Sequence, residues 1–444
     1  MKPKYSKKKI FAWSMYDFAN QPFTTLVITF IYGTYFTKFI AENEIIGTTL
    51  WSRAMTVTAI FVALLSPIMG AFADKGGYRK VFLFFWTYVC IFGSVVLFLP
   101  LPGEVAKALF WVVIANIGFE MGCVFNNAFL PDIAPKEKIG RVSGYGWSFG
   151  YVGGLIALAL ALILFVQPES PAFGITKDNG EHIRVTNLMV ALWLLIFSIP
   201  TFIWLDPDKS NKKHKLPILK ESFVQLSITF KNIRKYNQLI KFLLARIFYN
   251  DGLVTIFAFG GIYAAGTFGF TFQEIMVFGI VLNITAGIGA FVLGFLDDKI
   301  GSKNTIQISN IGLILACALA VIIPNKDLLL LNIPFLNIDT IISGKTLFWF
   351  SGILIGIFSG PNQASSRSLM AKFIPKSREN EFFGFFAFTG KATAFIGPML
   401  LGILTEIYNS QRAGVAIVLV MFVVGFLFLR LVNEDEGIDR AQNQ

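Results

Sequence analysis

The sequence predicts an all-α membrane protein with about twelve transmembrane helices in two six-helix halves. Three observations carry this prediction: an apolar composition, long apolar stretches as wide as a bilayer, and polar loop motifs that occur twice. Of 444 residues, 55% are hydrophobic and only 15% are charged, whereas soluble domains carry about 25% charged residues. An apolar surface of this size faces lipid, so the lipid bilayer is the first expected partner.

The spans follow from length, because a membrane helix needs about 20 mostly apolar residues. Stretches of this kind lie near 18–40, 51–73, 81–100, 107–130, 142–166, 186–205, 239–265, 273–296, 305–323, 345–369, 381–405 and 411–431. A polar stretch after the sixth divides the chain into a first half (1–205), a linker (206–236) and a second half (237–444). The basic start leads into the first span without a small-residue cleavage site, so we expect this span to be retained.

The linker contains apolar residues at helical spacing. Leu219, Phe223, Leu226 and Phe230 recur every three or four positions, with basic residues between them. This pattern is typical of an amphipathic helix that lies on the membrane surface. A regulatory helix that binds another protein is the alternative.

The basic residues indicate the orientation of the chain. Counted from the sequence, 28 of the 38 Lys and Arg residues fall on the side of the two termini, eight fall on the opposite side, and Arg246 and Lys391 lie inside spans. Because Lys and Arg concentrate in cytoplasmic loops, we expect both termini in the cytoplasm. The net charge of +11 is then a topology signal, and no nucleic-acid partner is expected.

A loop motif after the second span recurs after the eighth, at an offset of 224 residues. Its members are Gly70, Asp74, Lys75, Gly77 and Arg79 in the first half, and Gly294, Asp298, Lys299, Gly301 and Lys303 in the second. The first glycine of each set lets helices approach closely. Each aspartate can cap a helix N-terminus or pair with a base. We expect these loops to act as gates; a tight turn with topology charges is the alternative.

Two further matches support a repeat of the same orientation. Pro135-Lys136 and Gly144 match Pro375-Lys376 and Gly384 at an offset of 240, and Asp17 matches Asp251 at an offset of 234. Parallel repeats related by an axis along the membrane normal are a known transporter architecture.

These motifs resemble those of a known family. The repeated loop is similar to the signature loop of the major facilitator superfamily. The segment Trp13-Ser-Met-Tyr-Asp17-Phe-Ala-Asn20 resembles the start of its Unknown Major Facilitator branch, which includes fungal autophagy-related vacuolar amino-acid effluxers. Segments 125–131, 140–154 and 246–252 share this resemblance. The linker and loops are shorter than in the fungal members, so the resemblance implies a bacterial protein of the cytoplasmic membrane.

Two acids lie well inside predicted spans. A charge at bilayer depth costs at least about 2.5–3.5 kcal/mol on insertion scales, so it faces a cavity or a partner. Asp251 lies near the middle of the seventh span, and we expect a protonatable or cation-binding acid there; a structural ion pair is the alternative. Glu120 shares one helical stripe with Asn116 and Asn127. We interpret this stripe as cavity lining, with interhelical hydrogen bonding as the alternative.

The first span carries a similar polar face. Asp17, Asn20, Gln21 and Thr24 follow one another at helical spacing, which favours cavity lining. Capping of the first helix by Asp17 is the alternative.

Basic residues inside spans complete the predicted site. Arg246 is expected to contact an anionic substrate or to pair with Asp251 across the bundle. Lys391 is expected to pair with an acid such as Glu120, to bind a substrate carboxylate, or to form a fixed structural pair. Asn362 and Gln363 add polar groups beside Pro361, where we expect the helix to break. Arg367, nearer the cytoplasm, is interpreted as a topology charge.

The lead hypothesis is a secondary active transporter of a small polar metabolite, an amino acid or another zwitterion or anion. Alternating access and coupling to protons are expected, with a monomer in the membrane and without a cofactor or a metal site. A lipid or lysolipid flippase is one alternative, and a non-transporting membrane receptor or enzyme is another. The three cysteines fall in apolar runs, the two histidines fall in loops, and no catalytic constellation is visible.

Overall fold

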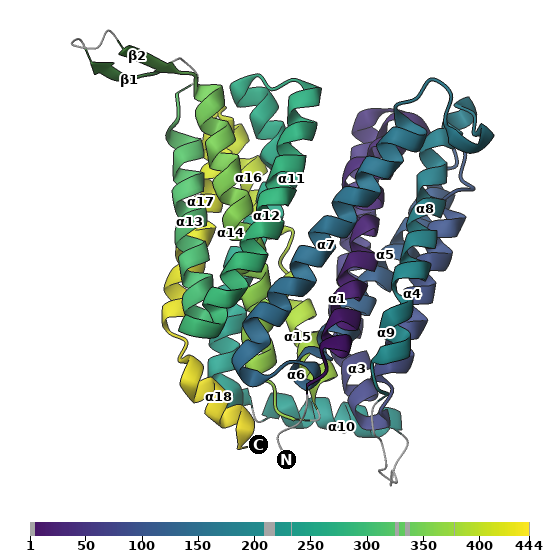
Figure 1. Cartoon of the computed structure of the whole chain (residues 1–444), viewed down its shortest axis with the longest axis vertical. Coiled ribbons are helices and arrows are strands. Elements are labelled where there is room, and N and C mark those ends of the chain that lie inside the picture. The colour runs from purple at the N-terminus through teal and green to yellow at the C-terminus, as the bar shows by residue number, and fades with distance from the viewer. Residues whose placement is uncertain are drawn as a thin grey trace.

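The computed structural model describes residues 5–207, 218–231, 233–324, 328–333, 338–376 and 378–443. It contains two bundles of long helices joined by a helix that crosses one end of the molecule (Figure 1). The first half holds α1 (Lys7–Pro22), α2 (Tyr32–Tyr35), α3 (Glu44–Gly76), α4 (Arg79–Val96), α5 (Val105–Asn127), α6 (Leu130–Ile133), α7 (Ile139–Ala161), α8 (Glu181–Phe197) and α9 (Ile199–Trp204).

The second half begins after the connecting helix α10 (Ile218–Lys231). It holds α11 (Asn237–Phe268), α12 (Phe272–Ile300), α13 (Ser302–Ile322), α14 (Gly344–Phe373), α15 (Glu379–Lys391), α16 (Ile396–Ile407), α17 (Gln411–Arg430) and α18 (Glu434–Gln442). Short π-helical and 3-10 turns extend several of these helices.

The predicted spans coincide with helices. In the described part of the chain, eleven helical segments are long and apolar enough to cross a membrane. The remaining span of the prediction, 345–369, coincides with α14, which is 30 residues long and packs against α12, α13 and α7. Its serines and amides lower its hydropathy, and all of them except Gln363 are buried against neighbouring helices, where polar side chains are tolerated.

The first span begins earlier than predicted. Helix α1 starts at Lys7 and continues beyond Pro22 as a π-helical segment, Phe23–Phe30. Asp17 therefore lies ten residues inside the helix, and the alternative that it caps the first helix is wrong. Proline has no N–H to donate to the preceding turn, which is one reason for a helix to change its winding.

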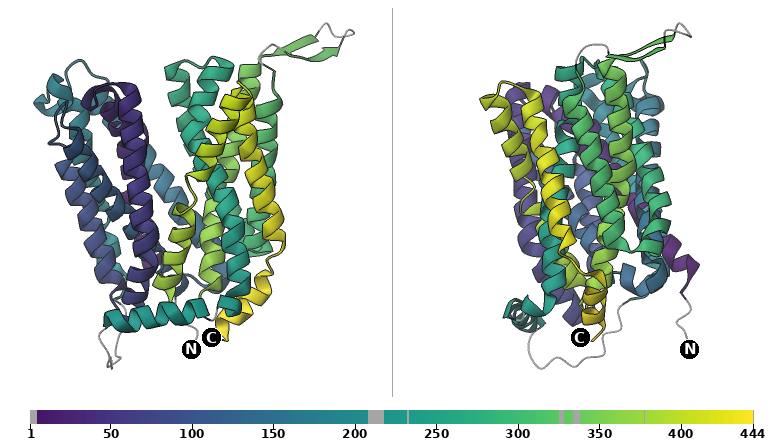
Figure 2. Two further views of the ribbon diagram at one scale, coloured as in Figure 1. Left: turned by 180° about the vertical axis from the view of Figure 1, so that it is seen from behind. Right: turned by 90° about the vertical axis from the view of Figure 1, so that its left-hand side faces the viewer.

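The two halves meet at one end of the molecule and diverge towards the other (Figures 1 and 2). Helices α10 and α18 and the start of α1 lie at the closed end, which we call the α10 end. There α3 packs against α15, and α7 packs against α12 and α14. The opposite end is called the open end.

Glycines set the close approach of the paired helices at the α10 end. A Cβ at Gly144 of α7 would lie 2.5 Å from the Ala290 carbonyl oxygen of α12, and one at Gly294 would lie 3.1 Å from Arg141 Cα. The α3–α15 pair repeats this arrangement, since a Cβ at Gly384 would lie 2.7 Å from Pro67 Cα. Only glycine fits between backbones this close.

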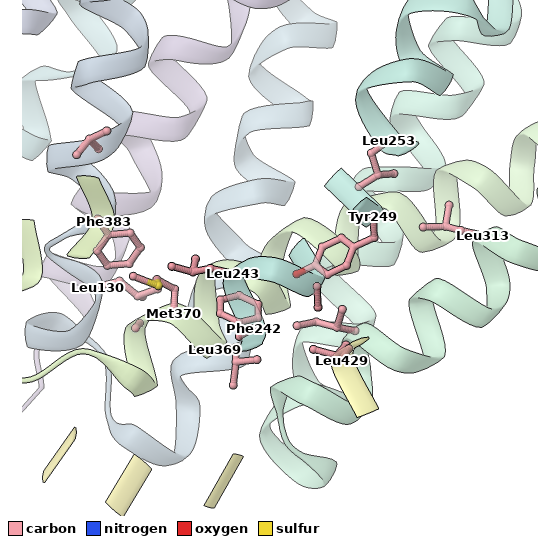
Figure 3. Packing of buried hydrophobic residues seen from close by; sticks show 14 of the residues in the cluster. Leu130, Phe242, Leu243, Tyr249, Leu253, Leu313, Leu369, Met370, Phe383 and Leu429 are labelled. Carbon is pink, nitrogen blue, oxygen red and sulfur yellow. The ribbon is translucent and has the colours of Figure 1, made fainter. Parts of the chain in front are cut away.

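A hydrophobic cluster joins the halves at the α10 end. Leu130 of α6, Met370 of α14 and Phe383 of α15 are buried in this cluster, which contains side chains from both halves (Figure 3). The second buried cluster lies within the first half, except for a partly buried contact from Ile280 of α12. The packed core is thus continuous between the halves at the α10 end.

The linker segment contains a helix. Helix α10 forms and packs against α3, with Leu226 buried. Phe223, Val224 and Ile228 are exposed, so Phe223 and Leu226 do not share one environment as the spacing predicted. His214 and the rest of 208–217 lie outside the described residues.

One element was not predicted. A short antiparallel hairpin, β1 (Leu328–Ile333) with β2 (Ile338–Ile342), extends from the second half at the open end (Figure 1).

Candidate functional site

The eleventh span is broken in two. Helix α15 ends at Lys391 and α16 begins at Ile396, with the residues between them outside regular helix. Gly390, Gly397 and Pro398 flank the break, and glycine and proline are the weakest helix formers. Backbone irregularity at membrane depth is tolerated where it borders a cavity or protein, and broken helices of this kind form binding sites in transporters.

Helix α11 supports the end of α15 next to the break. Arg246 donates to the Phe386 carbonyl oxygen at 2.8 Å and to Thr389 Oγ1 at 3.3 Å. Its guanidinium also lies 3.5 Å from the centre of the Phe386 ring. Asn250 Nδ2 donates to the Gly390 carbonyl oxygen at 3.4 Å. Arg246 is buried and thus stabilises the helix end from one side.

Asp251 contacts the break directly. Its Oδ1 accepts a hydrogen bond from Thr393 Oγ1 at 3.2 Å, and the residue is 1% exposed. Thr393 is one of the four residues between α15 and α16. A buried acid therefore holds the irregular segment, and its protonation would change this hydrogen bond.

We expect Thr393→Val to loosen the break. The substitution keeps the shape of the side chain and removes the donor to Asp251, which costs about 1 kcal/mol for a hydrogen bond inside a membrane protein. The unfolding midpoint in detergent is expected to fall for Thr393→Val and to stay near the parent value for Thr393→Ser, which keeps the hydroxyl. Equal midpoints for the two variants would show that this hydrogen bond does not stabilise the break.

An ion pair between the halves lies at the end of α15. Lys391 Nζ is 2.5 Å from Glu120 Oε1 of α5, which confirms the predicted pairing. The lysine lies in the last turn of α15, where a cation is favoured by the helix dipole. The side chains are 33% and 18% exposed, respectively. The pair is therefore both a contact between halves and a partly exposed charged group.

The other members of the predicted stripes separate. Asn127 accepts a hydrogen bond from Arg367 Nη1 of α14 at 3.1 Å, so it reaches the second half, as Glu120 does. Asn116 instead contacts Met55 Sδ of α3 at 3.5 Å, and it is buried inside the first half.

The polar face of α1 also divides. Asn20 is buried against Cys123 Sγ of α5, at 3.5 Å. Gln21 is partly exposed and lines a small pocket between the halves, together with Tyr151 of α7 and Asn283 of α12. Gln21 is therefore the member of this face that adjoins space shared by both halves.

Asp17 forms an ion pair with Arg367, which the sequence analysis interpreted as a topology charge. Its Oδ2 lies 2.8 Å from Arg367 Nη1 of α14, and Asn126 Nδ2 donates to its Oδ1 at 3.3 Å. Arg367 is 4% exposed, so its interpretation as a topology charge is wrong. Position near a span end gave no signal of this burial.

The expected break at Pro361 is also wrong. Helix α14 runs from Gly344 to Phe373 with Pro361 inside it. Asn362 is fully buried and donates to Asn310 Oδ1 of α13 at 2.8 Å, so it stabilises packing within the second half. Gln363 is partly exposed on the next position.

The two gate aspartates cap helices of the opposite half. Asp74 accepts from the backbone N–H groups of Asn380 at 3.1 Å and Glu381 at 2.8 Å, at the start of α15. Asp298 accepts from the Arg141 N–H at 3.2 Å, at the start of α7, and forms an ion pair with the Arg141 side chain. The predicted capping is thus confirmed for both loops, and each cap crosses between halves.

Among the remaining gate residues, Gly70 and Gly294 lie at contacts between the halves, and the others act within one half. Arg79 pairs with Asp132 Oδ2 at 2.6 Å, and the Lys303 N–H donates to Glu434 Oε2 at 2.8 Å. The other loop positions lie at the ends of helices. Lys75 and Lys299 are in the last turns of α3 and α12, and Gly77 and Gly301 are the C-cap residues of these helices. Gly77 and Gly301 have φ of 69° and 89°, where other residues are strained. A Cβ added at Gly70 would lie 2.9 Å from Glu381 Cα of α15.

The two ends of the molecule differ in the contacts between the halves. At the α10 end, helix caps, Arg367 and a hydrophobic cluster close the space between the halves. Towards the open end the helices diverge, and Glu120 and Lys391 are partly exposed. The contacts between the halves therefore concentrate at the α10 end.

Comparison with other proteins agrees with this geometry. The MFS-type transporter YxiO of Bacillus subtilis is 28% identical over 439 residues, covering 98% of this chain and 96% of that protein. Autophagy-related protein 22 of Cryptococcus neoformans is 26% identical over 302 residues, or 67% of this chain and 51% of that protein. The structure of the major facilitator superfamily (MFS) transporter FucP in its outward conformation is similar to this fold, with a TM-score of 0.71. The alignment covers 96% of this chain and 98% of the FucP chain, and the two sequences are 13% identical.

A family model extends the match over most of the sequence. The model described as "Vacuole effluxer Atg22 like" matches residues 44–442, which run from α3 to α18 and leave out α1 with its residues Trp13, Asp17 and Gln21. The chain therefore belongs to the Atg22-like family of membrane transporters of the major facilitator type.

Proposed function

We propose that this protein is a secondary active transporter of a small zwitterionic or anionic metabolite of the amino-acid class, driven by protons. One observation carries the proposal: the Glu120–Lys391 ion pair connects the halves, is partly exposed, and lies at the broken helix. The family description, "Vacuole effluxer", and the coverage of both halves support transport of a solute.

The ion pair suits a zwitterion for a simple electrostatic reason. An amino acid carries one carboxylate and one ammonium group, so it can bind Lys391 through the first and Glu120 through the second. Each protein charge then exchanges one partner for another and is never left unpaired at bilayer depth, where an unpaired charge is expensive. Binding would also separate the two halves at this contact, which links occupancy to conformational change.

The closed end supplies the alternating step. Separation at the α10 end requires loss of the caps at Asp74 and Asp298 and of the Asp17–Arg367 pair. With the termini in the cytoplasm of a bacterium, as the basic residues favour, this conformation faces away from the cytoplasm.

Asp251 is the proposed proton-coupling acid, because it is buried beside the break and bonded to it. We expect Asp251→Asn to abolish accumulation driven by a proton gradient, since an amide takes up no proton, while the protein still inserts. Exchange of labelled for unlabelled substrate without a gradient is expected to persist. Asp439→Asn, at an exposed position of α18, is the matched control. Gradient-driven transport at the parent rate in Asp251→Asn liposomes would refute the coupling role.

A ligand screen tests the substrate class. Purified protein is heated with amino acids, organic acids and nucleosides at several pH values, and hits are carried into exchange assays in liposomes. An amino acid that raises the unfolding midpoint and exchanges across the membrane supports the proposal. Stabilisation confined to nucleosides or neutral sugars would overturn the zwitterion assignment and leave the transporter fold intact.

A further inference from the structure

A cage on the first half surrounds the guanidinium of Arg367. We propose that this cage is a cation-binding site in its own right: Arg367 occupies it while the α10 end is closed, and the ammonium or guanidinium group of a solute occupies it when that end opens. The inference rests on the alternating-access part of the proposed function. The cage consists of Trp13, Asp17, Asn127, Ser143 and Trp147.

The hydrogen bonds of Arg367 all end on the first half. Its Nη1 donates to Asp17 Oδ2 at 2.8 Å and to Asn127 Oδ1 at 3.1 Å. Its Nε donates to Ser143 Oγ at 2.9 Å, and its Nη2 donates to the Ser143 carbonyl oxygen at 2.7 Å. Four acceptors, one of them a carboxylate oxygen, therefore converge on one planar cation that belongs to the opposite half.

Two aromatic rings complete the cage. The guanidinium carbon lies 4.5 Å from the centre of the Trp13 ring and 5.7 Å from that of Trp147. Rings within about 6 Å attract a cation through their π-face, and pairs of such rings are a common way to bind ammonium groups. Trp13 is held independently of Arg367, because its Nε1 donates to the Asn126 carbonyl oxygen at 2.7 Å in the same half.

The chain leaves room for the cation. A Cβ at Gly146 of α7 would lie 2.6 Å from Arg367 Nη2. The acid is also oriented by its own half, since Asn126 Nδ2 donates to Asp17 Oδ1. The first half thus provides a space, a carboxylate and ring faces, and none of these three features requires the second half.

Opening of the α10 end withdraws Arg367, because it is carried on α14. Asp17 then loses its counter-charge inside the bundle, and an unpaired acid there is unfavourable. A solute cation that enters from the α10 end removes this cost. The cage is therefore the place where the cationic group of a solute first binds on that side, and Arg367 displaces it when the end closes.

A free cation distinguishes a binding site from a structural pair. We would replace Arg367 by Ala in a protein whose three native cysteines are replaced and whose Met370, buried between the halves, is Cys. The rate of labelling of this cysteine by a maleimide reports opening of the α10 end. Guanidinium at millimolar concentration is the probe, and urea, which has the same planar shape without charge, is its control.

We expect Arg367→Ala to raise the labelling rate about 10-fold or more, a shift of about 1.4 kcal/mol. Guanidinium, but not urea, is expected to reverse most of this rise. In Asp17→Asn/Arg367→Ala, guanidinium is expected to have no effect. If Arg367→Ala is poorly folded, Arg367→Ser, which also leaves the cage open, takes its place in the series.

Three results would overturn the inference: no protection by guanidinium, equal protection by urea, or protection that survives Asp17→Asn. The assay reads conformation without any substrate, so its outcome is independent of the Glu120–Lys391 proposal. Conversely, loss of amino-acid transport in the screen leaves the labelling result standing.

Discussion

Neutralising either member of the Glu120–Lys391 pair is expected to reduce transport about 100-fold. Glu120→Gln leaves Lys391 without its partner at 2.5 Å, and Lys391→Gln leaves Glu120 in the same condition. An unpaired charge at bilayer depth costs about 2.5–3.5 kcal/mol, which corresponds to a loss of about 100-fold. Exchange of labelled substrate in liposomes at matched protein density measures the effect.

The double variant decides between a substrate site and a structural pair. Glu120→Gln/Lys391→Gln has no unpaired charge, so its thermal stability is expected to return towards that of the parent. Transport is expected to stay lost, because a zwitterion then meets two neutral amides. A double variant that transports at the parent rate would show that the pair only connects the halves. Glu274→Gln is the matched control, since the Glu274–Lys345 pair is also partly exposed but lies within the second half.

Gly144→Ala is expected to hold the α10 end apart and to reduce transport about 10-fold or more. The new Cβ would lie 2.5 Å from the Ala290 carbonyl oxygen, and neither backbone can move aside without separating α7 from α12. Gly384→Ala is expected to act in the same way on α3 and α15, where a Cβ would lie 2.7 Å from Pro67 Cα. Maleimide labelling of Met370→Cys measures the opening directly.

Two other glycines provide the controls for this series. A Cβ at Gly260 of α11 or Gly402 of α16 meets nothing within 4 Å. Gly260→Ala and Gly402→Ala are therefore expected to transport at the parent rate and to label as slowly as the parent. Slow labelling in Gly144→Ala as well would contradict a role for close packing in closing this end.

The sequence was sufficient to predict the positions of the spans and the repeated loop motif. Span positions depend on composition over about 20 residues, and a duplicated motif places equivalent loops in equivalent positions. The capping by Asp74 and Asp298 followed from their place at helix ends, and the Glu120–Lys391 pair followed from the cost of isolated charges in lipid. Each of these predictions depends on local pattern or on charge balance.

The remaining features depend on tertiary packing. Arg367 lies near a span end in the sequence, yet α7 and α1 cover it in the folded chain. The break at 392–395 was missed because it lies inside a mostly apolar span; Gly390 and Pro398 were the available signals. Pro361 gave the opposite error, since neighbouring helices keep α14 continuous around a proline.

The two cross-half caps differ in one respect that follows from α10. Arg141 and Glu381 occupy equivalent positions of the repeat, but Arg141 pairs with Asp298, whereas Glu381 accepts hydrogen bonds from Gln225 and Thr229 of α10. The two halves of a repeat are connected by a single linker. The linker helix α10 can therefore stabilise only one of the two equivalent caps. We therefore expect the two caps to open one after the other. The cap at Asp298 opens first, and the cap at Asp74, which α10 stabilises, opens later.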